Sequence, residues 1–278
     1  MNTSLCHIFD ALWRDYTTLN PQAERIHGLL KDRGEQVVND HIAFRTFAHP
    51  AVGLDILARP FVDRGYKAVE AYSFEEKKLF ARHYEHPDPA HPRIFISELL
   101  LEQCSPQLRS VADHLINTLP PNWTEDPLFV VSGRPWPTPR HGVYESLRRE
   151  SEYAAWLSIF GYRANHFTVR VNDLKGFDSL SAFNAFLIQQ GFVLNDRGGL
   201  IKGSPEEGLE QSSTLAEPIR VIFPDATREV PGCYYEFALR HKGSDGKLFG
   251  GFIARNANKI FESTDHIDAK TEQSQGTP

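Results

Sequence analysis

Two short segments of the chain carry a histidine and an arginine at the same spacing. Residues 39–47 read Asn-Asp-His-Ile-Ala-Phe-Arg-Thr-Phe, and residues 164–172 read Ala-Asn-His-Phe-Thr-Val-Arg-Val-Asn, so each contains His-x-x-x-Arg in an apolar run. A single histidine in a strand is more often a hydrogen-bonded core residue, but neutral imidazole is also a common metal ligand. Because His41 and His166 occupy matched positions, we interpret the pair as metal ligands.

A third candidate ligand is Glu236, in the apolar run Tyr-Tyr-Glu-Phe-Ala-Leu-Arg. Side chains alternate along a strand, so this carboxylate shares a face with Arg240 and is expected to be buried. Burying a carboxylate is costly unless it is paired, which leaves a salt bridge to Arg240 or Arg170, or a metal ion, as its partner. Two histidines and one carboxylate leave three positions open on an octahedral metal, which suits Fe(II) with a chelating substrate and O₂.

Two other groups compete for the same role. Glu98 follows Ile-Phe-Ile-Ser and occupies in the first half of the chain roughly the place that Glu236 has in the second. A second carboxylate ligand would fill a position that O₂ chemistry needs. The histidines at 83, 86 and 91 stand among prolines and are expected to be solvated residues of a hairpin loop.

The elements that must position these residues form an internal repeat. In both halves the histidine is followed by an aspartate, an amphipathic helix and a glycine, with His-to-Gly offsets of 24 (65 minus 41) and 25 (191 minus 166). Several β-like segments follow each glycine: Lys77–Tyr84 and Arg93–Leu100 in the first half, and Gly198–Gly203, Arg220–Phe223 and Cys233–Leu239 in the second. Matched features in the same order predict an α+β fold with two βαβββ modules.

The remaining segments are expected to flank these modules. Apolar spacing predicts helices over 4–16 and from Asn20-Pro21 to about Gly34. Six prolines exclude regular structure over about 120–140, and a polar helix is expected over 142–159. The predicted organisation is an N-terminal helical segment (1–38), a first module (39–119), a Pro-rich linker and helix (120–163), a second module (164–264) and a disordered tail (265–278).

Composition limits the choice of partners. A formal charge of −6 and a pI near 6.1 argue against nucleic acid, which needs a basic field. Three widely spaced cysteines disfavour a disulfide framework. The N-terminus does not resemble a signal peptide, and no run reaches the roughly 18 apolar residues of a membrane span. We therefore expect a cytoplasmic protein that contacts no membrane.

Several of these motifs resemble one known family. They are residues 39–47, Phe95-Ile96-Ser97-Glu98-Leu99, Asn165-His166, Tyr235-Glu236 and Lys259-Ile260-Phe261-Glu262-Ser263-Thr264. Together they resemble the 2-oxoadipate dioxygenase/decarboxylase family, which is similar to the 4-hydroxyphenylpyruvate-type dioxygenases. The resemblance covers about residues 5 to 264. It implies a half-open barrel of the vicinal oxygen chelate type with additional N-terminal helices.

The resemblance also implies an activity and a site. His41, His166 and Glu236 would bind Fe(2+), and Arg45 would hold a substrate carboxylate through its planar fork. Arg255 is a candidate for a second carboxylate contact. The substrates would be O₂ and a small 2-oxo dicarboxylic acid, with 2-oxoadipate giving 2-hydroxyglutarate and CO₂ as a step of lysine catabolism.

Two other functions fit the same fold. One is a glyoxalase-like lyase or isomerase that uses a divalent metal without O₂, in which Glu98 would be a ligand. The other is a protein that binds a small ligand or a metal without turnover. The doubled His-x-x-x-Arg and the single Glu236 favour the dioxygenase.

Overall fold

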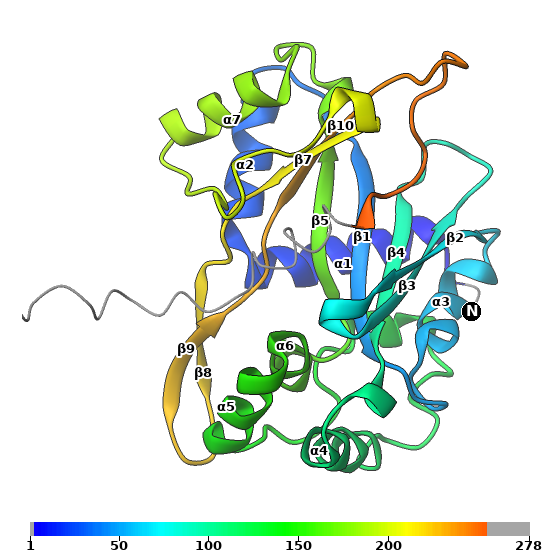
Figure 1. Cartoon of the computed structure of the whole chain (residues 1–278), viewed down its shortest axis with the longest axis vertical. Coiled ribbons are helices and arrows are strands. Elements are labelled where there is room, and N and C mark those ends of the chain that lie inside the picture. The colour runs from blue at the N-terminus through cyan, green and yellow to red at the C-terminus, as the bar shows by residue number, and fades with distance from the viewer. Residues whose placement is uncertain (1–2, 255–278) are drawn as a thin grey trace, which may run out of the picture.

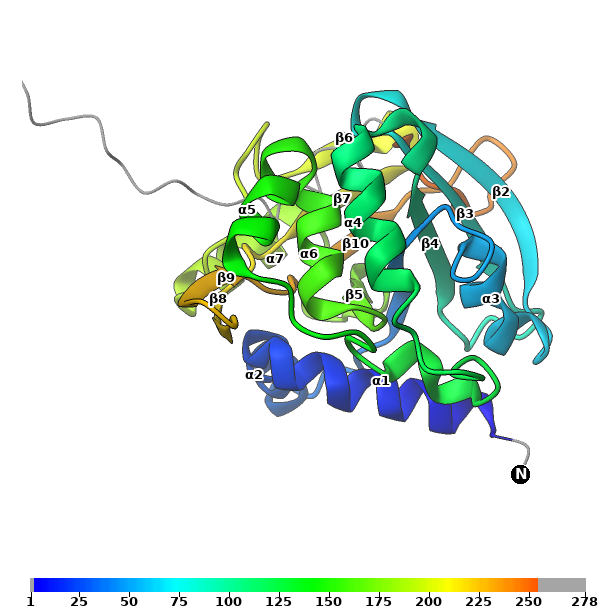
Figure 2. The ribbon, with the colours of Figure 1, turned by 90° about the horizontal axis from the view of Figure 1, so that it is seen from below.

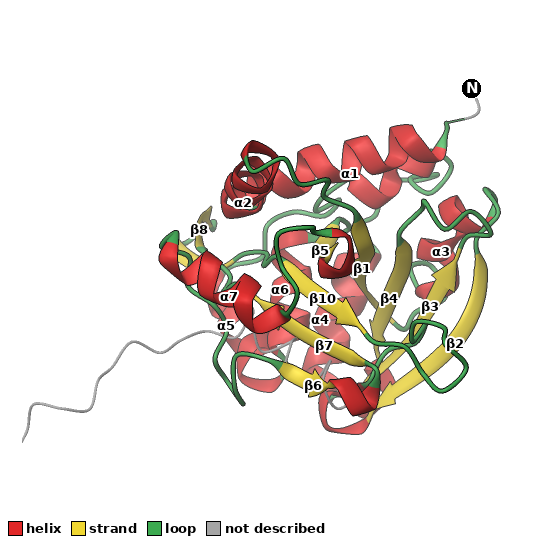
Figure 3. Cartoon of the chain, turned by 90° about the horizontal axis from the view of Figure 1, so that it is seen from above, coloured by secondary structure: helices red, strands yellow, loops and turns green. Residues whose placement is uncertain are grey.

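The computed structural model describes residues 3–254, and one curled sheet of eight strands dominates it (Figure 1). The order across the sheet is β2-β3-β4-β1-β5-β10-β7-β6. Viewed from above, the sheet curls into a half-open barrel (Figure 3). Its strands are β1 (Asn39–Phe47), β2 (Lys67–Phe74), β3 (Leu79–Glu85), β4 (Arg93–Leu99), β5 (Ala164–Arg170), β6 (Lys202–Ser204), β7 (Leu209–Ser213) and β10 (Glu236–Arg240).

Seven α-helices flank this sheet in the described part of the chain. Near the N-terminus and within the first repeat are α1 (Leu5–Leu19), α2 (Pro21–Asp32) and α3 (Leu54–Val62); α4 (Pro106–Ile116), α5 (His141–Glu150), α6 (Glu152–Phe160) and α7 (Leu180–Gln189) follow. Seen from below, α4, α5 and α6 lie across one end of the sheet (Figure 2). The ring of Trp13 in α1 packs edge-on against Phe167 of β5 at 5.1 Å, so α1 covers the outer face.

The predicted repeat is confirmed by the strand pairing. The first module runs β1-α3-β2-β3-β4, with β4 returning parallel to β1. The second runs β5-α7-β6-β7-β10, with β10 returning parallel to β5. The two first strands, β1 and β5, pair antiparallel at the centre of the sheet. This central pair places the two histidine-bearing strands side by side.

The prediction of one polar helix over 142–159 is wrong. Ser151 interrupts it, with an extended backbone and a side chain that accepts a hydrogen bond from the Ala154 amide, and so begins α6 as its N-cap. The residues from Tyr153 to Phe160 are all buried. Helix α6 is thus a core element, while α5 carries the polar residues that the sequence pattern had spread over both.

The second module differs from the predicted strand list in one insertion. The segment expected at Arg220–Phe223 forms β8 (Pro218–Ile222), which pairs with β9 (Thr227–Pro231) in a separate two-stranded sheet. Its place next to β10 in the main sheet is taken by β7, which was not expected. Strand β7 is rich in Gln and Ser, so its sequence lacks the apolar alternation that marks a strand. Strand β2 was missed for a related reason, since most of its residues are exposed at the sheet edge.

The linker before β5 contains little regular structure in the range 120–140, as predicted, apart from a 3₁₀ turn at Pro127–Val131. Gly161, which ends α6, has φ +66°, and a Cβ there would lie 2.2 Å from the Gly133 carbonyl oxygen. The Gly161→Ala variant is therefore expected to lower the free energy of unfolding by about 3 kcal/mol, measured by urea denaturation.

Gly142→Ala is the matched control for this substitution. Gly142 lies in the first turn of α5, where an added Cβ meets no atom within 4 Å. Alanine there should leave stability unchanged or raise it by up to about 1 kcal/mol. Equal effects of the two substitutions would contradict the role assigned to the Gly161 turn.

Candidate metal centre

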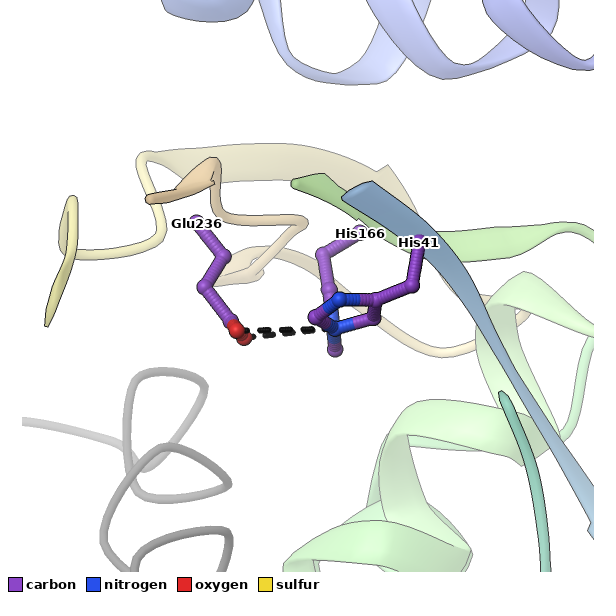
Figure 4. Close-up of side chains that lie close together, drawn as sticks. All are labelled: His41, His166 and Glu236. Atoms are coloured by element: carbon purple, nitrogen blue, oxygen red, sulfur yellow. Dashed lines mark hydrogen bonds and ion pairs between the residues drawn. The ribbon is translucent and has the colours of Figure 1, made fainter. Parts of the chain in front are cut away.

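Three buried side chains from adjacent strands meet on the inner face of the half-barrel (Figure 4). They are His41 on β1, His166 on β5 and Glu236 on β10, and one ligand atom of each lies within 4.8 Å of the others. The two Nε2 atoms are 3.4 Å apart. The Glu236 carboxylate oxygens lie 3.5 Å from His41 Nε2 and 3.3 Å from His166 Nε2. The sequence-predicted trio is therefore brought together around one point.

The sheet register explains this convergence. Across the antiparallel β1–β5 pair, His166 lies opposite Ala43, and His41 lies opposite Thr168. Glu236 pairs with the same Thr168 from the parallel strand on the other side. Because paired residues point to the same face, all three candidate ligands project inward within two residue steps of one another.

Each imidazole is oriented by the residue before it. His41 Nδ1 lies 2.9 Å from Asp40 Oδ1, and His166 Nδ1 lies 3.1 Å from Asn165 Oδ1. With Nδ1 donating to an oxygen in both rings, each neutral imidazole presents the Nε2 lone pair to the shared point. Two imidazole nitrogens and a carboxylate directed at one point are a donor set that fits a divalent metal ion.

The electrostatics of the cluster agree with this fit. Burial raises the pKa of the Glu236 carboxyl, and the nearby His41 and the hydrogen bond from Gln211 offset only part of the rise. Burial, followed by the nearby His41 and Arg45, lowers the pKa of His166 well below its usual value. Without a metal ion, the carboxylate form of Glu236 and the imidazolium form of His166 are thus both disfavoured. A divalent cation compensates the carboxylate and needs the neutral imidazole.

Two further residues hold this centre, and the sequence reading assigned a role to neither. Gln211 of β7 donates its amide to Glu236 Oε1 at 2.7 Å. Asp40 receives a fork of two hydrogen bonds from Arg240, at 2.7 and 2.8 Å. Although burial alone would raise it, the Arg240 guanidinium holds the pKa of Asp40 well below its usual value. The only sequence signal for Asp40 was its position directly before His41.

Replacing Arg240 by Met tests this support. Asp40 would stay buried and lose both hydrogen bonds from Arg240, with Arg93, 3.7 Å from its Oδ2 atom, as the remaining cation, so the free energy of unfolding should fall by about 3 kcal/mol. Because Asp40 orients His41, affinity for a divalent metal should fall roughly 10- to 100-fold. Urea denaturation and metal titration measure the two effects. The control is Arg170→Met, because Arg170 pairs with Asp173 at the partly exposed end of β5 and should contribute at most about 1 kcal/mol.

Arg45 lies on the same face of β1 as His41, at the end covered by α6. Its side chain is buried, and its guanidinium carbon lies 5.0 Å from the ring centroids of both Tyr153 and Trp156. Tyr234, whose pKa is raised by burial and lowered in part by Arg45, stacks on the His166 ring at 4.6 Å. The Tyr234 side chain thus lies between Arg45 and the candidate ligand His166. The other predicted carboxylate contact, Arg255, lies outside the described residues, as does the tail predicted over 265–278.

Glu98 does not join the candidate ligands. Its carboxylate accepts a hydrogen bond from the Leu54 amide at 2.8 Å and so caps the start of α3 on the other face of the sheet. Ala43 and Thr168 each lie two residues after the histidine of their module. Ala43 pairs with Phe95, and Thr168 pairs with Glu236, so the strand register makes Phe95 the counterpart of Glu236. The expected correspondence between Glu98 and Glu236 is therefore wrong by three residues.

The predicted loop histidines are only partly in a loop. His83 belongs to β3, is buried and lies 2.8 Å from the Tyr72 hydroxyl through Nδ1. His86 and His91 are in the β3–β4 connection, with ring centroids 4.6 Å apart. Within residues 3–254, these three histidines form no group with metal-ligand geometry.

A curled sheet of two βαβββ modules with a two-histidine, one-carboxylate cluster on its inner face defines the vicinal oxygen chelate class of fold. The sequence profile of one family, 2-oxoadipate dioxygenase/decarboxylase, matches residues 6–119 and 130–247. The chain belongs to this family, as the motifs had implied. No helix in the described part of the chain is long and apolar enough to cross a bilayer.

Individual relatives agree with this assignment. A chloroplastic 2-oxoadipate dioxygenase/decarboxylase from Arabidopsis thaliana is 36% identical in an alignment 275 positions long that covers 90% of this chain and 74% of the relative. The rice (Oryza sativa) hydroxyglutarate synthase, solved in complex with 2-oxoadipate, is 35% identical with a TM-score of 0.86, over 93% of this chain and 91% of the other. A Shewanella frigidimarina protein, whose crystal structure is described as that of a putative hydrolase, shares the fold under that different name: it is 48% identical with a TM-score of 0.87, over 91% of this chain and 98% of the other.

Proposed function

We propose that this protein is an Fe(II)-dependent dioxygenase/decarboxylase of a small 2-oxo dicarboxylic acid, with 2-oxoadipate as the substrate. The balanced reaction is 2-oxoadipate plus O₂ to 2-hydroxyglutarate plus CO₂. Family membership and the name of the rice relative, solved with 2-oxoadipate bound, support the reaction and the substrate. The lysine-catabolic role, the cytoplasmic location and the division of the chain into segments stay predictions.

The observation that carries the proposal is the meeting of His41, His166 and Glu236 on one inner face. We assign these three residues as the iron ligands. Three protein ligands leave room on the metal for a chelating 2-oxo acid and for O₂. When bound, Fe(II) supplies the electrons that activate O₂, which protein side chains cannot do. Glu98, which the O₂-independent alternative needs as a ligand, is occupied at the start of α3.

The chain's own residues bind and orient the reactants. Arg45 offers a planar, permanently charged fork for a substrate carboxylate. The rings of Tyr153 and Trp156 both pack against this fork and restrict it, which reduces the entropy lost on binding. On the other side, the Phe252 ring meets His41 edge-on at 4.8 Å and limits water near that ligand. Arg45 and the metal thus select anionic 2-oxo acids.

Oxygen uptake by Fe(II)-reconstituted protein tests the proposal. The substrates to compare are 2-oxoadipate, 2-oxoglutarate, 2-oxopimelate, and methylglyoxal with a thiol. We expect uptake with a 2-oxo dicarboxylic acid, accompanied by an equal amount of CO₂. Turnover of the methylglyoxal adduct without oxygen uptake would favour the lyase, and iron-loaded protein inert toward all four would favour the binding protein.

A further inference from the structure

A surface cavity of about 330 Å³ opens beside the end of β1 that carries Arg45. One wall is the turn from Glu76 to Leu79 that begins β3, and the other is the junction of α5 and α6 from Arg148 to Tyr153. Helices α5 and α6 flank this end of the sheet in Figure 1. The cavity is therefore distinct from the metal centre but shares Arg45 with it.

The cavity has a surplus of positive charge. Among the described residues that line it, five are Lys or Arg and three are Glu, although the whole chain has a formal charge of −6. Lys78 and Glu150 partly compensate each other at 3.7 Å. Lys77 and Arg149 form no ion pair within residues 3–254, so their field acts on the space between the walls. A concave site lined by one sign of charge concentrates ions of the opposite sign.

The inner end of the cavity leads toward the metal centre. Arg45 is only 2% exposed, yet it lines the cavity together with Tyr153. The Tyr153 hydroxyl donates to the Ser97 carbonyl at 2.7 Å, which fixes the ring beneath the Arg45 guanidinium. Beyond Arg45 lies Tyr234, and the Tyr234 ring stacks on His166. Arg45 therefore stands between the cavity, which Lys77 and Arg149 line, and the candidate metal ligand His166.

We propose that this cavity is the entry site for the carboxylate substrate, in which Lys77 and Arg149 capture a small aliphatic dicarboxylate and guide it to Arg45. The inference deepens the proposed function and rests on it for the identity of the substrate. The capture step itself needs only a carboxylate and a cationic cavity, so it can be measured without metal and without turnover.

The test uses the double variant Lys77→Glu/Arg149→Glu, with Lys175→Glu as its control. Lys175 is exposed between β5 and α7, on the other module, and belongs to neither site. Isothermal titration of the full-length, metal-free protein with adipate is the first readout. We expect the double variant to bind adipate at least tenfold more weakly than the wild type, and Lys175→Glu to bind it as the wild type does.

The second readout is kinetic, with Fe(II)-loaded protein and 2-oxoadipate. The double variant should lower kcat/KM about tenfold at low salt while leaving kcat within about twofold, because capture precedes chemistry. The deficit should nearly vanish near 1 M ionic strength, where the Debye length is about 3 Å. The neutral variant Lys77→Gln/Arg149→Gln should show a smaller loss of the same kind.

Three outcomes would overturn the inference: wild-type protein that binds no adipate, a double variant that binds it normally, or an equal loss in Lys175→Glu. Failure of the proposed function looks different. In that case no 2-oxo acid causes oxygen uptake, while adipate binding to the metal-free protein still depends on Lys77 and Arg149.

Discussion

Replacing Glu236 by Ala is expected to abolish iron retention and, with it, all oxygen uptake. The substitution removes the only carboxylate in the cluster and leaves two neutral imidazoles, which bind a divalent cation weakly. Affinity should fall more than the roughly 10- to 100-fold typical of losing a residue that only orients a ligand. Metal analysis after gel filtration measures retained iron. The isosteric Glu236→Gln keeps an oxygen that can accept the hydrogen bond from Gln211, so it should lose metal while keeping the fold.

Glu98→Ala is the matched control, because it removes the glutamate that the O₂-independent alternative would use. Its carboxylate caps the Leu54 amide, so we expect a loss of about 1 kcal/mol in the free energy of unfolding and unchanged iron content. Normal iron content in Glu236→Ala would refute the proposed ligand set. Loss of iron in Glu98→Ala would instead restore the lyase-like reading.

Replacing Arg45 by Met should give the second large effect, a loss of substrate binding rather than of metal binding. Methionine has a similar length and can pack against the rings of Tyr153 and Trp156, so the fold and the iron content should be retained. Losing a buried, charge-assisted contact to a carboxylate should cost about 3 kcal/mol, which is roughly a 150-fold decrease in kcat/KM. Steady-state oxygen uptake over a range of 2-oxoadipate concentrations measures it.

Arg45→Lys separates charge from geometry. It keeps the positive charge but loses the planar fork, so its kcat/KM should lie between those of the wild type and Arg45→Met. A 2-oxo acid that lacks the second carboxylate, 2-oxohexanoate, shows which end of the substrate Arg45 holds. If Arg45→Met turned over 2-oxoadipate with unchanged kcat/KM, the carboxylate-binding role of Arg45 would be wrong.

Much of the fold could be predicted because its pattern occurs twice. The matched histidines, the glycines at nearly equal offsets and the alternating apolar strands predicted two βαβββ modules, and the strand pairing confirms them. Strands that bury an apolar face, such as β1 and β4, carry a pattern that can be read locally. Strands β2 and β7 were missed because one is largely exposed and the other is polar inside the half-barrel.

The correspondence between the modules shows where pattern reading reaches its limit. Glu98 and Glu236 stand at similar points along the two repeats, and both follow apolar residues. A strand has a period of two, so a correspondence wrong by three residues moves a side chain to the opposite face. Only the register shows that Phe95, and not Glu98, is the counterpart of Glu236. The first module therefore contributes a histidine but no carboxylate to the candidate centre.

The sequence by itself determined the types of the candidate ligands, their strands and the faces on which they lie, because alternation within a strand is a local property. The tertiary structure alone decided what surrounds them. Asp40 and Arg240 are 200 residues apart, yet they form the buried pair that orients His41. The cavity beside Arg45 likewise combines a turn of the first module with the junction of α5 and α6. Such contacts depend on how the sheet curls and which helices close its end, and no spacing along the chain encodes them.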